Sequence, residues 1–120
     1  GAVLLDDRCC DPLYRKAIRV SVGAALTVPF ARLAACSDPI ALLERHGFTP
    51  VALSPGGAAV LAHTDSPPRA GFLLGSEGPG LPDDLMTRAV TLRIPMASGF
   101  DSLNVATTSG IVLHHWRSRT

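Results

Sequence analysis

Two stretches of the sequence decide the fold: Leu74-Gly75-Ser76-Glu77-Gly78-Pro79-Gly80-Leu81 and Ile94-Pro95-Met96-Ala97-Ser98-Gly99-Phe100-Asp101-Ser102-Leu103-Asn104-Val105. The glycines and the proline of the first stretch predict a tight loop in which the backbone approaches another group closely. The loop lacks the order of a phosphate-binding glycine loop, and Glu77 adds a charge that would repel a phosphate. A neutral or cationic ligand, such as a sulfonium cofactor with an adenine, fits better. A plain strand–helix connection is the alternative.

The second stretch predicts a strand that ends at Pro95, a loop of small residues and a helix that begins near Ser102. Either Asp101 or Ser102 would cap that helix. Asn104 would then lie in the first helical turn, where asparagine is a mediocre helix former and its amide can face the loop. On spacing alone, a purely structural role for these polar residues stays open.

Apolar runs alternate with helix signals along the whole chain. We expect strands at residues 2–5, 26–30, 51–53, 71–74 and 90–94. We expect helices at residues 11–22, 37–47 and 102–117, and a short one that begins at residue 82. This alternation predicts an α/β fold, with a mainly parallel sheet and helices on both faces. Ligands of such a sheet bind beyond the carboxyl ends of its strands, where the loops at residues 54–57, 75–81 and 95–101 would lie.

Length and composition favour one small globular domain that spans residues 1–120. The formal net charge of +1 argues against a stand-alone nucleic-acid binder, which would usually be clearly basic. Cys9, Cys10 and Cys36 are odd in number and poorly spaced for disulfides or zinc, so we expect no metal and a reducing, cytoplasmic location. No apolar run approaches the ~20 residues that a membrane helix needs, so we expect no membrane partner.

Together, the two stretches resemble motifs 2 and 3 of the SpoU/TrmH family of the SPOUT superfamily. That family's pattern is Leu-Gly-x-Glu-Gly-x-Gly, then Ile-Pro-Met, a glycine-bearing loop and Ser-Leu-Asn-Val, and every position is matched here. The resemblance implies an RNA 2′-O-ribose methyltransferase that uses S-adenosylmethionine on structured RNA, either tRNA or rRNA. It also implies a C-terminal deep trefoil knot and a homodimer. The last helix would offer the dimer an apolar face with Val105, Ile111, Val112 and Trp116.

The same resemblance assigns two sets of residues. The positions that match the family's cofactor pocket and its immediate neighbours are Leu74, Gly75, Ile94, Met96 and Leu103. The positions that match its active site are Glu77, Ser102 and Asn104. For Glu77, our physical interpretation is that it orders the loop and favours a cationic cofactor; a loop-bracing role without direct contact is the alternative.

The family's motif 1, Asn-x-Gly-x-x-x-Arg, is absent from this sequence, which opens directly on the apolar run at residues 2–5. We therefore expect an N-terminally truncated methyltransferase domain. Arg8, Arg15 and Arg19 do not match the position of the motif 1 arginine, so that residue's role is not transferred to them. Two other functions stay open: a base methyltransferase of the same superfamily, and a non-catalytic RNA-binding or assembly module on the same fold.

Overall fold

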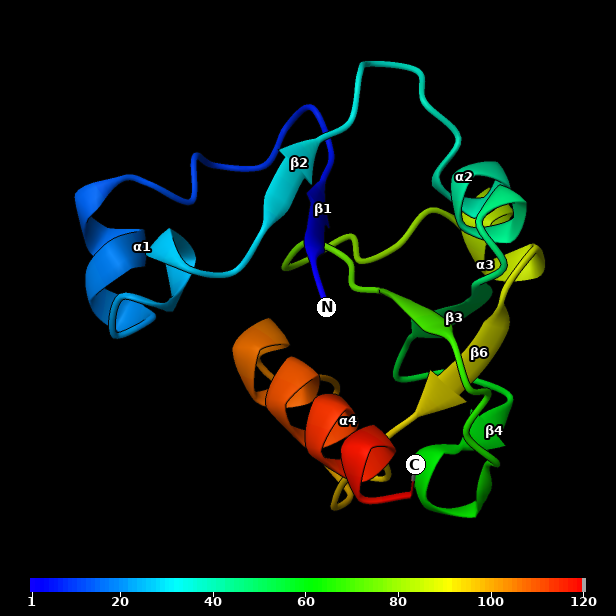
Figure 1. Ribbon diagram of the computed structural model, residues 1–120. Helices are drawn as coiled ribbons and strands as arrows, with labels where there is room; N and C mark the ends of the chain where they lie inside the picture. Colours follow the sequence, from blue (N-terminus) through cyan, green and yellow to red (C-terminus); the bar gives the residue numbers. More distant parts are fainter. Residues whose placement is uncertain (120) are drawn as a thin grey trace. The chain divides into compact units, whose positions relative to one another are not determined.

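A computed structural model of the chain describes residues 1–119, and its contacts divide the chain into two compact units. The first unit is Gly1–Asp38 and the second begins at Pro39. Figure 1 shows the helices and strands of both units, coloured along the sequence.

The first unit pairs two short strands with a helix between them in sequence. Strands β1 (Val3–Leu5) and β2 (Phe30–Arg32) are parallel, and helix α1 spans Arg15–Val20. The helix begins later than expected because Asp11 forms a local turn, in which its carboxylate accepts a hydrogen bond from the Leu13 amide at 2.9 Å. Such side-chain turns compete with helical hydrogen bonds.

The prediction of a strand at residues 26–30 is wrong. A 3₁₀ helix, η1 (Ala24–Leu26), takes its place, and the Val28 amide extends this turn by donating to the Ala24 carbonyl at 2.9 Å. The strand begins only after Pro29, whose carbonyl accepts a hydrogen bond from the Val3 amide at 2.9 Å. Pro29 has no amide hydrogen to donate, so it is tolerated at the edge of the strand and does not end it.

The second unit contains a four-stranded parallel sheet in the order β4-β6-β3-β5. Its strands are β3 (Thr49–Leu53), β4 (Ala59–Val60), β5 (Ala70–Leu73) and β6 (Val90–Arg93). Val51 in the central strand β3 pairs with Phe72 of β5 and Val90 of β6. The three longer strands confirm the expected ones, whereas β4 and the 3₁₀ helix η2 (Leu61–His63) were not expected.

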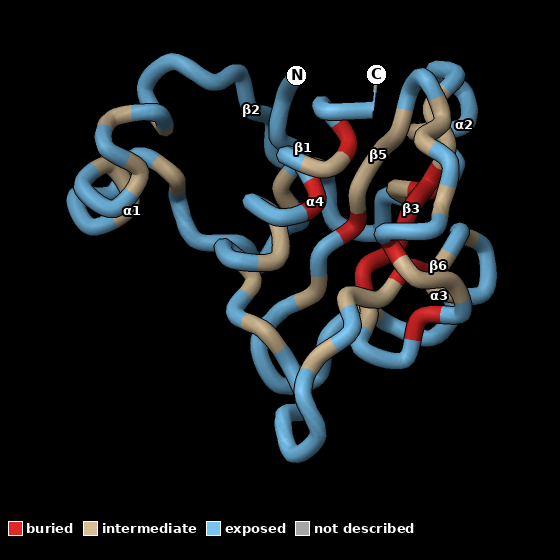
Figure 2. The backbone as a smooth tube through the Cα atoms, turned by 90° about the horizontal axis from the view of Figure 1, so that it is seen from below, coloured by how far each residue is buried: buried red, intermediate tan, exposed pale blue. Residues whose placement is uncertain are grey.

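Helices cover both faces of this sheet, as expected. They are α2 (Pro39–Arg45), α3 (Asp83–Thr87) and α4 (Val105–Arg119). Ala52 packs with Ile40 of α2 on one face, where side chains of α3 join them. Its neighbours Val51 and Leu53 pack on the other face, against α4. Alternate residues of β3 therefore face opposite cores, and buried residues concentrate along the central strands (Figure 2).

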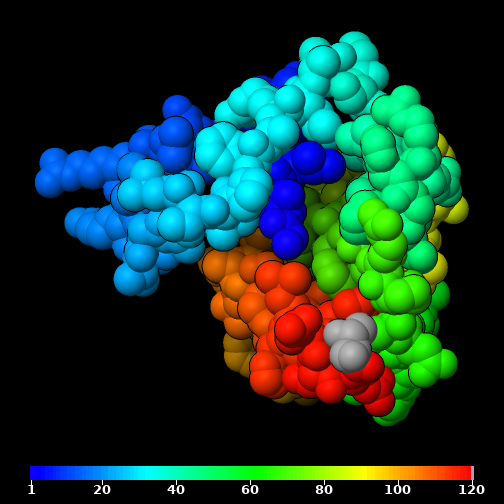
Figure 3. Space-filling view, viewed as in Figure 1, coloured from blue at the N-terminus to red at the C-terminus, as the bar shows by residue number. Residues whose placement is uncertain are grey.

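Helix α4 is held against the sheet by aromatic and hydrogen-bond contacts. Trp116 meets the ring of Phe72 edge-on, with the ring centroids 4.9 Å apart, and its indole nitrogen donates to the Pro67 carbonyl at 3.2 Å. Near the end of the helix, Arg119 Nη1 donates to the Ala62 carbonyl at 3.3 Å. The surface of α4 accordingly lies beside that of the segment near residue 60 (Figure 3).

These contacts correct the expected dimer face of α4. Val112 and Trp116 are only 1% and 8% exposed, because both pack into the core of the second unit. The large apolar side chains that α4 leaves exposed are Ile111 and Leu113.

Within residues 1–119, no helix has both the length and the apolar character required to cross a bilayer. In the same residues, no three His, Cys, Asp or Glu side chains come together as metal ligands would.

Candidate functional site

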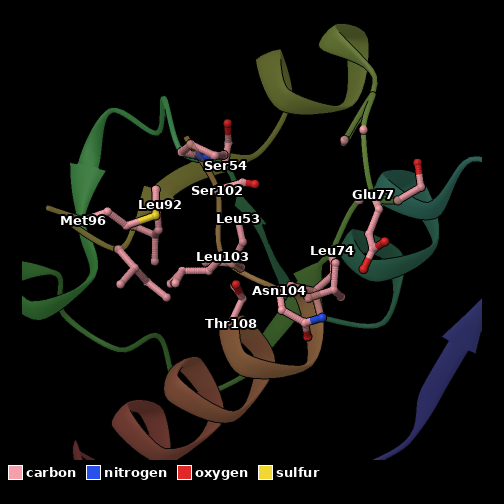
Figure 4. A pocket seen from close by; sticks show the side chains of 17 residues that line it. Leu53, Ser54, Leu74, Glu77, Leu92, Met96, Ser102, Leu103, Asn104 and Thr108 are labelled. Atoms are coloured by element: carbon pink, nitrogen blue, oxygen red, sulfur yellow. The ribbon is translucent and has the colours of Figure 1, made fainter. Parts of the chain in front are cut away.

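A pocket of about 450 Å³ lies in the second unit, beyond the carboxyl ends of β3, β5 and β6 and at the start of α4 (Figure 4). This is the edge at which the sequence placed the three candidate loops. Strand ends contribute Leu53 and Leu92, the following loops contribute Ser54 and Pro55, and α4 contributes Thr108. The walls therefore combine apolar side chains with hydroxyl groups, a composition typical of small-molecule sites.

All eight residues assigned from the sequence line this one pocket. They are Leu74, Gly75, Glu77, Ile94, Met96, Ser102, Leu103 and Asn104. Met96 lies on the opposite side of the pocket from Glu77 and Asn104 (Figure 4). Among the lining residues, Glu77 is the only one with an ionisable side chain. The pocket is thus largely neutral, with a single carboxylate on one side.

The glycine-rich loop at residues 75–81 folds back on itself. The Gly80 amide donates to the Ser76 carbonyl at 3.1 Å, and Gly80 adopts a left-handed conformation with φ of 68°. A Cβ atom on Gly75 would lie 2.4 Å from the Gly80 carbonyl carbon and the Leu81 nitrogen. Gly75 is therefore required by close backbone packing, which explains why the loop needs glycine at this position.

The loop after β3 is fastened to β6. The Ser54 amide donates to the Leu92 carbonyl at 3.0 Å, and the Ala58 amide donates to the Thr91 hydroxyl at 3.0 Å. Arg93 Nη1 donates to the carbonyls of Gly57 and Ala58 at 2.7 and 3.0 Å. These bonds fix the wall of the pocket that Ser54 and Pro55 form.

Sequence reasoning singled out the loop at 54–57 only by its composition and missed Arg93. The signal in the sequence was weak, because an arginine at a strand end is ordinarily solvated. Gly57 carried a clearer signal: a Cβ atom there would lie 2.4 Å from the Leu92 carbonyl carbon. A second glycine in a turn can mark such a close approach of two backbone segments.

Asn104 corrects the expected start of the last helix. It is the N-cap of α4, and its Oδ1 atom accepts hydrogen bonds from the amides of Ala106 at 2.8 Å and Thr107 at 3.4 Å. Asp101 and Ser102, expected to cap the helix, precede it in a segment without regular secondary structure. The side-chain oxygen of Asn104 is used by the helix, while its NH₂ group still carries two hydrogen-bond donors.

The fold and site together define a class: a parallel α/β domain with a largely neutral pocket at the carboxyl ends of its strands. The chain belongs to the SpoU rRNA Methylase family, whose sequence profile matches residues 1–114. It is 42% identical to an uncharacterized tRNA/rRNA methyltransferase of Mycobacterium tuberculosis (strain ATCC 25618 / H37Rv), over 94% of this chain and 41% of that protein.

Two further relatives have more specific descriptions. A 23S rRNA (adenosine(1067)-2′-O)-methyltransferase of Streptomyces azureus is 33% identical over 95% of this chain and 43% of its own length. The crystal structure of an AdoMet-bound rRNA methyltransferase from Sinorhizobium meliloti superimposes with a TM-score of 0.88 at 31% identity, covering 98% of this chain and 45% of that one. The chain spans less than half the length of each of these three relatives.

Proposed function

We propose that this chain is the cofactor-binding and catalytic part of an S-adenosylmethionine-dependent RNA methyltransferase that modifies a ribose 2′-oxygen of tRNA or rRNA. The observation that carries the proposal is that all eight residues matching the family's cofactor and active-site positions line one pocket. The Streptomyces azureus relative, named as a 2′-O-methyltransferase, supports the ribose as acceptor. The AdoMet-bound Sinorhizobium meliloti structure supports the cofactor.

The pocket suits S-adenosylmethionine in size and chemistry. Its volume of about 450 Å³ lies in the range of roughly 300–1,000 Å³ usual for cofactor sites. Leu74, Ile94 and Leu103 supply apolar surface for an adenine, and Gly75 lets the loop backbone close against Gly80 and Leu81 beside them. Glu77 supplies a negative charge that favours a cationic ligand. When bound, S-adenosylmethionine supplies an electrophilic methyl group on its sulfonium.

The residues of the pocket would act mainly by orientation. The NH₂ group of Asn104 would donate hydrogen bonds to the incoming ribose, and the Ser102 hydroxyl would position the same group. Holding a nucleophile at the correct angle accounts for a large part of the rate in such transfers. Met96, across the pocket from Asn104, would contact the cofactor and not the ribose.

The first test is isothermal titration of S-adenosylmethionine into a protein that contains this chain together with motif 1. We expect saturable binding, and no binding would sink the cofactor assignment. Tritiated methyl transfer to transcribed tRNA and rRNA, followed by mass spectrometry of the nucleosides, then identifies the acceptor. A methylated base would favour the base methyltransferase. RNA binding without any transfer would favour the non-catalytic module.

The second test separates capping from catalysis at Asn104. Asn104→Ala removes both the cap and the NH₂ donors, whereas Asn104→Asp keeps an oxygen that can cap the helix. We expect both variants to lose methyl transfer by orders of magnitude. Only Asn104→Ala should lose stability, by about 1 kcal/mol. Near-normal transfer by Asn104→Asp would leave Asn104 as a helix cap only.

We also propose the finer features that family membership suggests: a deep trefoil knot, a homodimer and a cytoplasmic location. Sedimentation equilibrium of the complete domain tests the dimer, and a monomer at all concentrations would contradict it. Ile111 and Leu113 are the exposed apolar residues of α4 that such a dimer could bury. A crystal structure of the complete domain with cofactor would show whether the chain is knotted.

A further inference from the structure

A second hollow, of about 550 Å³, adjoins the candidate cofactor pocket. Its walls share three residues with that pocket, namely Pro55, Ile94 and Met96. The remaining wall includes Phe100 and Asp101 from the loop between β6 and α4. We call this space the Phe100 hollow. Because Met96 belongs to both spaces, a ligand in the Phe100 hollow would lie next to one bound in the cofactor pocket.

Phe100 is unusual among the apolar residues of the second unit. Its side chain is 71% exposed, more than any other large hydrophobic side chain described from residue 39 onward. The other large apolar residues around the cofactor pocket are less exposed; Leu74, for example, is 38% exposed. An exposed aromatic ring next to a ligand pocket offers a flat face for stacking, which is how proteins hold unpaired RNA bases.

The chemistry of the Phe100 hollow suits a nucleobase better than a phosphate. Phe100 and two prolines, Pro55 and Pro95, provide apolar surface for a flat ring. The Asp101 carboxylate accepts hydrogen bonds from base N–H groups but repels a phosphate. Arg93 also lines the hollow and offsets the charge of Asp101, while its Nη1 donates to the carbonyls of Gly57 and Ala58. The preference for a base therefore rests mainly on the apolar surface of Phe100 and the two prolines.

The position of the hollow indicates which nucleotide it would hold. Glu77 and Asn104 lie across the cofactor pocket from Met96 (Figure 4), and Met96 also lines the Phe100 hollow. In the proposed function the reacting ribose is held by Asn104. A base in the Phe100 hollow therefore belongs to a neighbouring nucleotide of the same RNA strand.

We infer that the Phe100 hollow binds the base of a nucleotide flanking the methylated one, with the base stacked on the ring of Phe100. The inference rests on the proposed function, because it needs an RNA strand at the cofactor pocket. Stacking accepts any base, so Phe100 contributes affinity and strand position more than sequence selectivity. Phe100 is a substrate-binding residue that does not touch the transferred methyl group.

The first experiment compares Phe100→Leu, which keeps an apolar side chain, with Phe100→Trp, which keeps an aromatic face. The protein again includes motif 1, and the substrate is the transcribed RNA that the wild type methylates. For Phe100→Leu, kcat/KM for RNA should fall about 5- to 150-fold, the change that corresponds to roughly 1–3 kcal/mol for one base stack. Phe100→Trp should restore most of the activity.

Two controls keep the outcome specific. Val90→Ala removes another exposed apolar side chain, from the far end of β6, and should leave kcat/KM unchanged. The affinity of Phe100→Leu for S-adenosylmethionine should match that of the wild type, which a general disturbance of the pocket would not allow. The inference is overturned if Phe100→Leu has the same kcat/KM for RNA as the wild type. It is also overturned if Phe100→Trp is no more active than Phe100→Leu.

The second experiment replaces the base of each nucleotide beside the mapped methylation site with an abasic ribose. At one flank, this change should lower wild-type kcat/KM by about the same factor as Phe100→Leu, and the two changes together should cause no further loss. Additive losses at both flanks would overturn the inference while leaving the methyltransferase intact. A wild type that neither binds S-adenosylmethionine nor methylates RNA would instead refute the proposed function.

Discussion

The two units of the chain are ordered in different ways. Among residues 1–119, the nine buried hydrophobic side chains all belong to the second unit, and none of residues 1–38 is buried. In the first unit, Val20, Val22 and Leu26 are 68%, 94% and 65% exposed. Local hydrogen bonds hold that unit instead: Arg32 Nη1 donates to the carbonyls of Asp6 and Cys9 at 2.9 and 2.8 Å.

This difference matters for function because the residues lining the candidate cofactor pocket run from Leu53 to Thr108, all in the unit with the core. Close packing of buried residues transmits small changes of shape to their neighbours. A pocket built on such packing should lose ligand affinity when the core is altered. The first unit should tolerate substitution of its apolar residues, because few of their contacts would be lost.

The sharpest comparison is Leu92→Ala against Leu26→Ala. Leu92, on the central strand β6, is fully buried, so Leu92→Ala should lower the free energy of unfolding by about 2–5 kcal/mol. Leu26 is 65% exposed, and Leu26→Ala should change the free energy of unfolding by less than about 0.5 kcal/mol. Urea unfolding followed by circular dichroism measures both values. Similar losses for the two variants would show that the units do not differ as their burial indicates.

The same contrast explains which parts of the fold the sequence predicted. The longer strands of the second unit were predicted from their apolar residues, and the clearest signal is the buried run Val51–Leu53 at the centre of the sheet. Strand β4 has two residues and carries no periodic signal. In the first unit, the turn after Gly23 overrode the apolar run at 26–30. Local turn hydrogen bonds decided the structure there, and hydrophobic pattern alone does not reveal them.

The motif named the residues of the candidate site, and the structure brings them together in one pocket, while their roles in binding and catalysis stay predictions. Gly75 is required by its approach to Gly80; the glycine-rich composition predicted a tight loop, but not which backbone atoms meet. Asn104 lines the pocket, but its role as N-cap was missed because α4 begins three residues later than expected. Helix ends are the least certain part of any pattern-based prediction.

Two glycines give the second comparison. In Gly75→Ala, the added methyl group would overlap the Gly80 backbone, so unfolding free energy should fall by about 1–3 kcal/mol and cofactor affinity should fall as well. Gly23 in the first unit has open space around it but a φ of 81°. Gly23→Ala should lower stability by about 1–2 kcal/mol through backbone strain and leave cofactor affinity unchanged. Isothermal titration of S-adenosylmethionine into both variants separates the two mechanisms. If Gly23→Ala weakens binding as much as Gly75→Ala does, packing is not the reason for Gly75.

The smallest effect concerns the thiol of Cys9 in the first unit. Local desolvation raises the pKa of the Cys9 thiol, although the residue is exposed, and a hydrogen bond to the Asp6 carboxylate raises this pKa further. The hydrogen bond from the Cys9 side chain in turn lowers the pKa of Asp6, aided by the Arg8 amide. Because only the thiolate reacts with iodoacetamide, Cys9 should be alkylated slowly at neutral pH.

Asp6→Asn tests whether this local network, and not burial, governs the first unit. The asparagine oxygen can still accept the amide hydrogens of Arg8 and Cys9, which Asp6 Oδ1 accepts at 2.9 and 2.8 Å, so the turn should persist. Loss of the negative charge should lower the pKa of Cys9 and speed its alkylation several-fold.

The measurement uses iodoacetamide at fixed pH with Cys10 and Cys36 replaced by serine, and Asp7→Asn as the control. The pKa of Asp6 is lowered in the folded chain, so its carboxylate stabilises the turn at neutral pH, and that contribution is lost as the pH falls through the lowered value. An alkylation rate unchanged by Asp6→Asn would mean that local desolvation alone protects the thiol. The contrast between the two units would then be weaker than their hydrogen bonds indicate.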